Sequence, residues 1–65
     1  MIKQDDFKEL LDAARTLEKE MNCEWDLIRT DAERAYYQRV ILNFTRAIWS
    51  IEDAARWHAL FEKHA

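Results

Sequence analysis

The chain of 65 residues contains neither glycine nor proline, and this constrains its fold more than any motif does. Tight turns between β-strands depend on glycine, proline or Asn-Gly pairs. Helices, in contrast, can be joined by short polar connections that need none of these residues. A hydrophobic content of 49% also argues against a disordered segment. The composition therefore predicts a folded, all-α protein.

The short length limits the size of the hydrophobic core. Residues 1–65 form one small domain, and a single cysteine, Cys23, rules out a disulfide within the chain. Chains below roughly 70–80 residues rarely gain more than about 3–5 kcal/mol from one core without a disulfide, a metal or a partner. We therefore expect self-association, most simply as a symmetric homodimer.

The segment from Thr30 to Ser50 has the clearest helical pattern. Thr30 and Glu33 have the spacing of a capping box, in which each residue satisfies a backbone amide of the other. Apolar residues then recur at the i, i+3, i+4, i+7 spacing of one helix face. We predict a helix over residues 31–49. Its apolar face comprises Tyr36, Tyr37, Val40, Ile41, Phe44, Ala47 and Ile48.

A first helix is predicted over residues 5–28. Either Gln4 or Asp5 could cap it, and Asp5 is the better residue type for that position. Asn22 could stop the helix, but continuation to Ile28 keeps the apolar face intact. The link Arg29–Thr30 is then so short that the two helices would be antiparallel neighbours. The apolar face comprises Phe7, Leu10, Leu11, Ala14, Leu17, Met21, Trp25 and Ile28.

A third helix is predicted over residues 51–64. Ser50 and Asp53 resemble a second capping box. The apolar face of Ile51, Ala54, Trp57 and Phe61, with Ala65, is rotated by roughly 85° from that of residues 31–49 on one straight helix. A break near Ser50 would realign the two faces. The predicted fold is an antiparallel hairpin plus a shorter third helix, a small three-helix bundle. The alternative is a two-helix hairpin with one long, bent second helix.

A second apolar stripe lies on the helix predicted over residues 31–49, outside its main face. We call Ala35, Leu42 and Trp49, spaced seven residues apart, the Leu42 stripe. Tryptophan is enriched at interface hot spots, so the Leu42 stripe is the candidate interface; otherwise Trp49 would tuck under the third helix. Trp25 and Trp57 lie on apolar faces and are predicted to be core residues.

The sequence carries no pattern of catalytic or ligand-binding residues. Cys23, His58 and His64 are too few for a zinc site, which needs three or four ligands at suitable spacing. The carboxylates of the first helix have the spacing of a solvated helix face. We expect no enzymatic activity, no metal and no cofactor.

The charges give little support for nucleic-acid binding. The net charge is −3, with five Lys/Arg against eight Asp/Glu in residues 1–30 and five of each in residues 31–65. The alternative function is nonetheless a small dimeric DNA-binding transcriptional regulator that reads DNA with the helix over 31–49 or that over 51–64. Its candidate contacts are Arg34, Arg39, Arg46 and Arg56.

Location and function follow from these features as expectations. The N-terminus lacks the apolar stretch of a signal peptide and no run is long enough to span a membrane, so a cytoplasmic location is expected. In size and composition the chain is similar to the short helical accessory or regulatory proteins of bacteria and phages. The predicted function is a non-enzymatic protein–protein interaction module that binds a second copy of itself and an unidentified protein.

Overall fold

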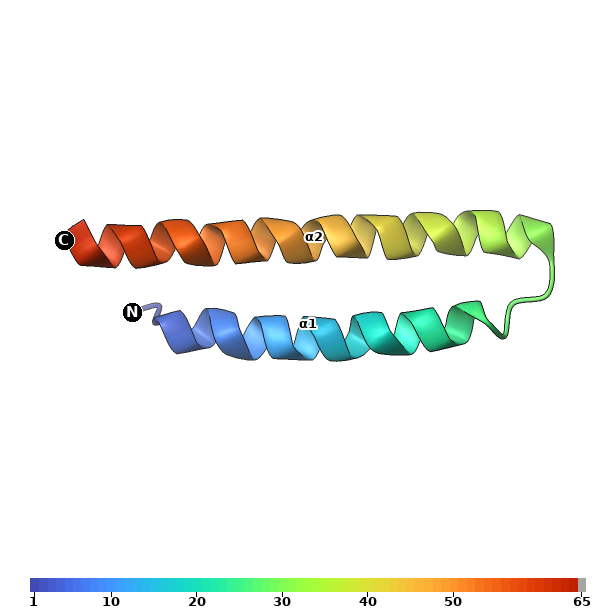
Figure 1. The fold of residues 1–65 in the computed structure, drawn as a ribbon, viewed down its shortest axis with the longest axis horizontal. Helices are drawn as coiled ribbons and strands as arrows, with labels where there is room; N and C mark the ends of the chain where they lie inside the picture. Colours follow the sequence, from blue (N-terminus) through green and yellow to red (C-terminus); the bar gives the residue numbers. More distant parts are fainter. Residues whose placement is uncertain (65) are drawn as a thin grey trace.

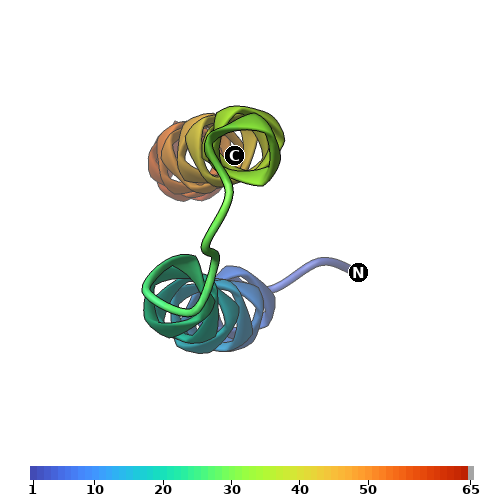
Figure 2. The same cartoon turned by 90° about the vertical axis from the view of Figure 1, so that its right-hand side faces the viewer.

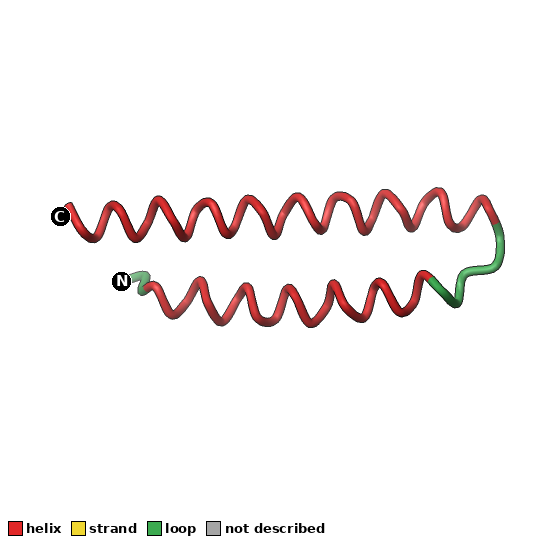
Figure 3. The backbone as a smooth tube through the Cα atoms, viewed as in Figure 1, coloured by secondary structure: helices red, strands yellow, loops and turns green. Residues whose placement is uncertain are grey.

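The protein is an antiparallel helical hairpin in a computed structural model that describes residues 1–64. Helix α1 (Gln4–Trp25) is followed by a connection over residues 26–30 and by helix α2 (Asp31–His64) (Figure 1, Figure 3). The end-on view in Figure 2 shows α1 and α2 side by side. The molecule is a rod of 52 × 16 × 14 Å.

The prediction of an all-α hairpin is confirmed, but the prediction of a third helix is wrong. Helix α2 continues through Ser50 without interruption, as the alternative two-helix arrangement proposed. The expected break came from treating two different stripes of α2 as one face. Ile51 belongs to the stripe that contacts α1, whereas Ala54, Trp57 and Phe61 lie on a neighbouring stripe. With Ile51 assigned to its own stripe, no rotation remains at Ser50.

The two helices meet along one stripe from each, which together we call the inner seam. Its members in each helix are separated alternately by four and three residues without a break, as in a coiled coil. We call this the four–three spacing. Gln4 lies beside His58 at one end, and the rings of Trp25 and Tyr37 are 6.5 Å apart at the other. In α1 the seam residues are Gln4, Phe7, Leu11, Ala14, Glu18, Met21, Trp25 and, just beyond the helix, Ile28. In α2 they are Tyr37, Ile41, Phe44, Ile48, Ile51, Ala55 and His58.

The core of the hairpin is thin. Within residues 1–64, only Ile48 (4% exposed) and Ala55 (8% exposed) are buried, and both belong to α2. Trp25 is half-buried, but Trp57 is 63% exposed, so its prediction as a core residue is wrong. A helix pair leaves both sides of its seam open to water, whereas a third helix would have covered one side.

Both ends of α1 differ slightly from their predicted positions. Helix α1 begins at Gln4 rather than at residue 5, after the Lys3 amide has donated a hydrogen bond of 2.8 Å to the Asp6 carboxylate. It ends at Trp25 rather than at 28, and the amide of Leu27 then bonds the Glu24 carbonyl at 2.9 Å in a tighter turn. The connection is consequently longer than the two residues predicted.

Thr30 starts the second helix as predicted. Its hydroxyl accepts a hydrogen bond of 3.3 Å from the amide of Glu33, which is one half of the expected capping box. Helix α2 has 34 residues against 22 in α1, and Figure 1 shows that it extends past α1 at both ends. Near its C-terminus, Phe61 is 66% exposed.

Candidate protein-binding surface

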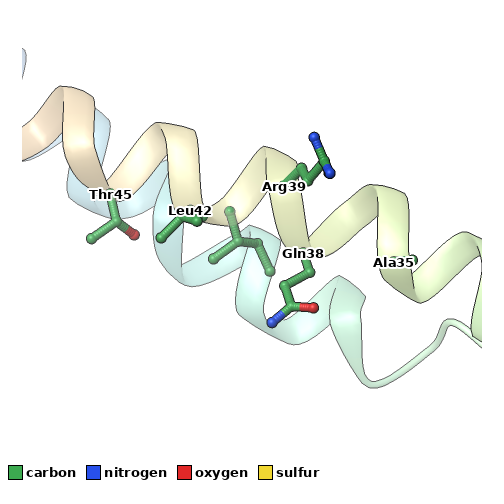
Figure 4. A pocket seen from close by; sticks show the side chains of 6 residues that line it. Ala35, Gln38, Arg39, Leu42 and Thr45 are labelled. Atoms are coloured by element: carbon green, nitrogen blue, oxygen red, sulfur yellow. The ribbon is translucent and has the colours of Figure 1, made fainter.

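The Leu42 stripe lies on an open flank of α2. Leu42 is about half exposed and Trp49 is 65% exposed, so neither is covered by α1. Ala35 and Leu42 border a shallow hollow of about 530 Å³ (Figure 4). The other residues that line this hollow are Gln38, Arg39, Ile41 and Thr45.

The hollow adjoins the inner seam, because one of its lining residues, Ile41, is a seam residue. Gln38 and Thr45 extend toward α1, whereas Arg39 points away (Figure 4). The Thr45 hydroxyl donates a hydrogen bond of 3.2 Å to the Glu18 carboxylate across the seam. An apolar side chain placed here would contact Leu42 and Ile41, with polar groups at its margin, which is the usual composition of a protein-binding pocket.

Trp49 borders a second hollow along the same helix. This hollow of about 390 Å³ is lined by Trp49, Glu52, Asp53 and Arg56. Arg56 forms an ion pair with Asp53, and Glu52 is paired with Arg15 of α1 at 3.3 Å. An indole ring thus lies among paired charges, and the possibility that it tucks under a third helix is excluded by the course of α2.

The four arginines considered for DNA binding have different surroundings. The Arg34 side chain donates a hydrogen bond of 3.0 Å to the Ile28 carbonyl and lies 5.6 Å from the ring centroid of Trp25. It therefore holds the connection against the start of α2. Arg56 is paired with Asp53, and Arg39 lines the hollow beside Leu42. Arg46 follows Arg39 by seven residues on the outer side of α2.

Two titratable side chains connect the helices at opposite ends of the hairpin. The Tyr37 hydroxyl donates a hydrogen bond of 3.1 Å to the Glu24 carboxylate. Partial burial, this hydrogen bond and the negative charge of Glu24 together raise the pKa of Tyr37 above 10.0. At the other end, Nδ1 of His58 lies 3.2 Å from the side-chain oxygen of Gln4 and 3.3 Å from Glu62. Both groups serve to join α1 to α2.

Among residues 1–64, no three His, Cys, Asp or Glu side chains are grouped so that they could hold a metal ion. Over that range neither helix has a stretch long and apolar enough to cross a membrane. Cys23 is exposed on α1. The chain matches no protein-family model, no curated protein and no solved structure.

Some members of this surface could not be recognised from the sequence. Gln38 and Thr45 were not singled out because they are polar, and Ile41 was assigned to the helix face that contacts α1. The seven-residue spacing of the Leu42 stripe was the signal in the sequence, and it identifies only one wall of the hollow.

Proposed function

We propose that this protein is a non-enzymatic helical interaction module, of the accessory kind found in bacteria and phages, that acts by binding other protein chains. The observation that carries the proposal is the exposed Leu42 stripe beside its hollow. Helix α2 contacts α1 through the inner seam, which is a different stripe. The apolar side chains of Leu42 and Trp49 therefore remain exposed to water. Covering such surface is favourable by roughly 25 cal/mol per Å².

The shape of the surface favours a helical partner. The hollow beside Leu42 and the hollow beside Trp49 follow each other along α2, seven residues or two turns apart. An amphipathic helix presents apolar side chains at i, i+3, i+4 and i+7, a spacing that matches two such hollows. The client is therefore proposed to be an amphipathic helix with two apolar anchors.

Self-association is the other part of the proposal. The hairpin has two buried residues among those described, which is a small core for a chain of this length. A second copy would cover the open side of the inner seam. We propose a homodimer that presents one Leu42 stripe per protomer to its client.

Capture of partners from host extract tests the client surface. Tagged wild-type protein should retain a client that the Leu42→Ala/Trp49→Ala variant loses. Leu27→Ala is the matched control, because Leu27 is an exposed apolar residue in the connection and lines neither the hollow beside Leu42 nor the hollow beside Trp49. Nuclear magnetic resonance with the captured client should shift the indole signal of Trp49. Equal capture by all three proteins would contradict the proposed surface.

A further inference from the structure

A second unbroken pattern, made of uncharged residues, lies on α2 next to the inner seam. Starting at Tyr36 and ending at Phe61, eight residues follow the four–three spacing of a helix-contact stripe, and none of them is charged. We call them the uncharged stripe. Its members are Tyr36, Val40, Asn43, Ala47, Ser50, Ala54, Trp57 and Phe61. All eight are exposed in the hairpin, so α1 does not cover this stripe.

The uncharged stripe lies along the edge of the hairpin opposite the Arg15–Glu52 ion pair. Antiparallel helices are related by a local two-fold axis, so equivalent positions of their repeats lie at the same edge. Arg15 and Glu52, each four residues after a seam residue, meet at 3.3 Å across one edge. The opposite edge carries residues that directly precede seam residues. These are Leu10 and Leu17 of α1, both exposed, and Val40, Ala47 and Ala54 of α2.

The accessible area of the hairpin indicates how much surface is left uncovered. The chain exposes 5662 Å², whereas a compact monomer of 7.9 kDa exposes about 4,400 Å². The excess of about 1,250 Å² exceeds the roughly 800 Å² that each partner buries in a standard interface. The radius of gyration is 15.5 Å, against about 11 Å for a compact chain of this length. The hairpin is therefore more extended than a compact monomer. A second copy could cover an area of this size.

We propose that a second copy of the chain docks on the uncharged stripe, with the two α2 helices antiparallel, to form a four-helix bundle. This inference specifies the homodimer of the proposed function and does not depend on the client. The evidence for orientation is the order of residue sizes. Small residues occupy the middle of the stripe and bulky ones occupy both ends, so it has nearly the same profile in either direction.

An antiparallel register centred between residues 48 and 49 pairs every member of the stripe. Tyr36 then faces the partner's Phe61, and Val40 faces the partner's Trp57. Toward the centre, Asn43 and Ala47 face the small residues Ala54 and Ser50 of the partner. Crossing helices are closest at the centre and diverge toward their ends. Small central and large terminal side chains fit that geometry.

The charges beside the stripe complement each other in the same register. Arg46 and Asp53 directly precede Ala47 and Ala54 and therefore lie on one flank of the stripe. In the antiparallel arrangement Arg46 comes within about 3 Å, measured along the helix axis, of the partner's Asp53. Because the dimer has a two-fold axis, it contains this contact twice. A parallel two-fold arrangement would instead place Arg46 and the partner's Asp53 on opposite sides of the interface, so this contact could not form.

Cysteine cross-linking tests the arrangement. The Val40→Cys/Trp57→Cys variant is made in a Cys23→Ser background. Oxidation, or a short bismaleimide, should convert most of this protein to a covalent dimer. Within one chain these positions are 17 residues or about 26 Å apart on α2, so they cannot react with each other. Each single variant should remain uncoupled, because the antiparallel register places Val40 opposite Trp57 and not opposite itself.

Leu42→Cys/Ala59→Cys is the matched control, with the same separation on the other flank of α2. It should not cross-link. Coupling of the single variants would show a parallel dimer, and coupling of the control pair would show that the copies meet elsewhere; either result overturns the inference. Sedimentation equilibrium separates this failure from failure of the proposed function. A dimer with the wrong cross-links refutes only this geometry, whereas a strict monomer refutes self-association altogether.

A charge exchange provides a second test that leaves the stripe intact. Arg46→Asp and Asp53→Arg should each raise the dimer dissociation constant by about tenfold, since each places two like-charge contacts in the dimer. The double variant should bring the constant back toward the wild-type value. Additive weakening in the double variant would mean that Arg46 and Asp53 do not meet across the dimer.

Discussion

Glu18 accepts a hydrogen bond of 3.2 Å from the hydroxyl of Thr45 within the inner seam. It occupies the seam position between Ala14 and Met21, and all the other seam residues of α1 from Phe7 to Trp25 are apolar. A half-buried carboxylate loses part of its hydration there and gains one neutral partner. Such a group costs stability relative to an apolar residue of similar size.

Glu18→Leu should therefore stabilise the hairpin. Leucine would pack against the seam without loss of hydration, and we expect the free energy of unfolding to rise by roughly 1–2 kcal/mol. Urea unfolding followed by circular dichroism measures the change. Glu9→Leu, on the exposed side of α1, is the matched control and should have little effect. A loss of stability in Glu18→Leu would mean that the bond to Thr45 outweighs the loss of hydration.

Ile48 should be the most sensitive apolar position of the chain. It is the least exposed residue and lies at the centre of α2 in the seam. Ile48→Ala should lower the free energy of unfolding by about 2–4 kcal/mol, and Ile48→Val by about 0.5–1.5 kcal/mol. Leu42→Ala, six residues away and outside the seam, should change it by less than about 0.5 kcal/mol. Similar costs at both positions would contradict the assignment of the seam.

The helical class could be predicted from the sequence because it depends on composition. The absence of glycine and proline removes most alternatives, and Thr30 caps a helix through its local geometry. The sequence alone could not distinguish the stripe of α2 that contacts α1 from the uncharged stripe beside it. Tyr36 and Tyr37, or Val40 and Ile41, are neighbours on the helix and equally apolar, so periodicity alone joins two stripes into one broad face. The separation depends on the position of α1.

The binding surface was predictable only in part for a related reason. Leu42 and Trp49 are outside the main apolar face on any helical wheel, and the structure shows both exposed on α2. The hollow beside Leu42 is also lined by Thr45 and Gln38, which are polar and are therefore not marked by an apolar pattern. Glu18 was missed as a contact residue because a charged side chain at a seam position departs from the apolar pattern used to find the seam.

Ser50→Ala distinguishes one long helix from two. Within continuous α2, alanine has the higher helix propensity, so we expect stabilisation by about 0.5 kcal/mol. If Ser50 were a helix cap, the same change would cost about 1 kcal/mol. The sign of the shift in thermal unfolding therefore decides between them. Thr30→Ala provides the comparison, because its hydroxyl does cap α2 and its loss should cost about 1 kcal/mol.

Tyr37 should make the hairpin sensitive to alkaline pH. Partial burial and the hydrogen bond to Glu24 raise its pKa in the folded chain above the 10.0 of a free phenol. Below about pH 10 the phenol is protonated in both states, so its contribution to stability is fully present. As pH rises further, the unfolded chain loses the proton first, and the contribution disappears as pH passes the folded pKa. The Tyr37→Phe variant should lack this component of the pH dependence.

Ultraviolet titration measures the pKa of Tyr37 directly. Tyr36→Phe leaves Tyr37 as the single tyrosine of the chain, and its ionisation midpoint should lie above 10. Adding Glu24→Gln removes the negative charge but keeps an oxygen that can accept the hydrogen bond. The midpoint should therefore fall toward the value of a free phenol. A midpoint at or below 10 with Glu24 present would show that Tyr37 and Glu24 do not join the helices in solution.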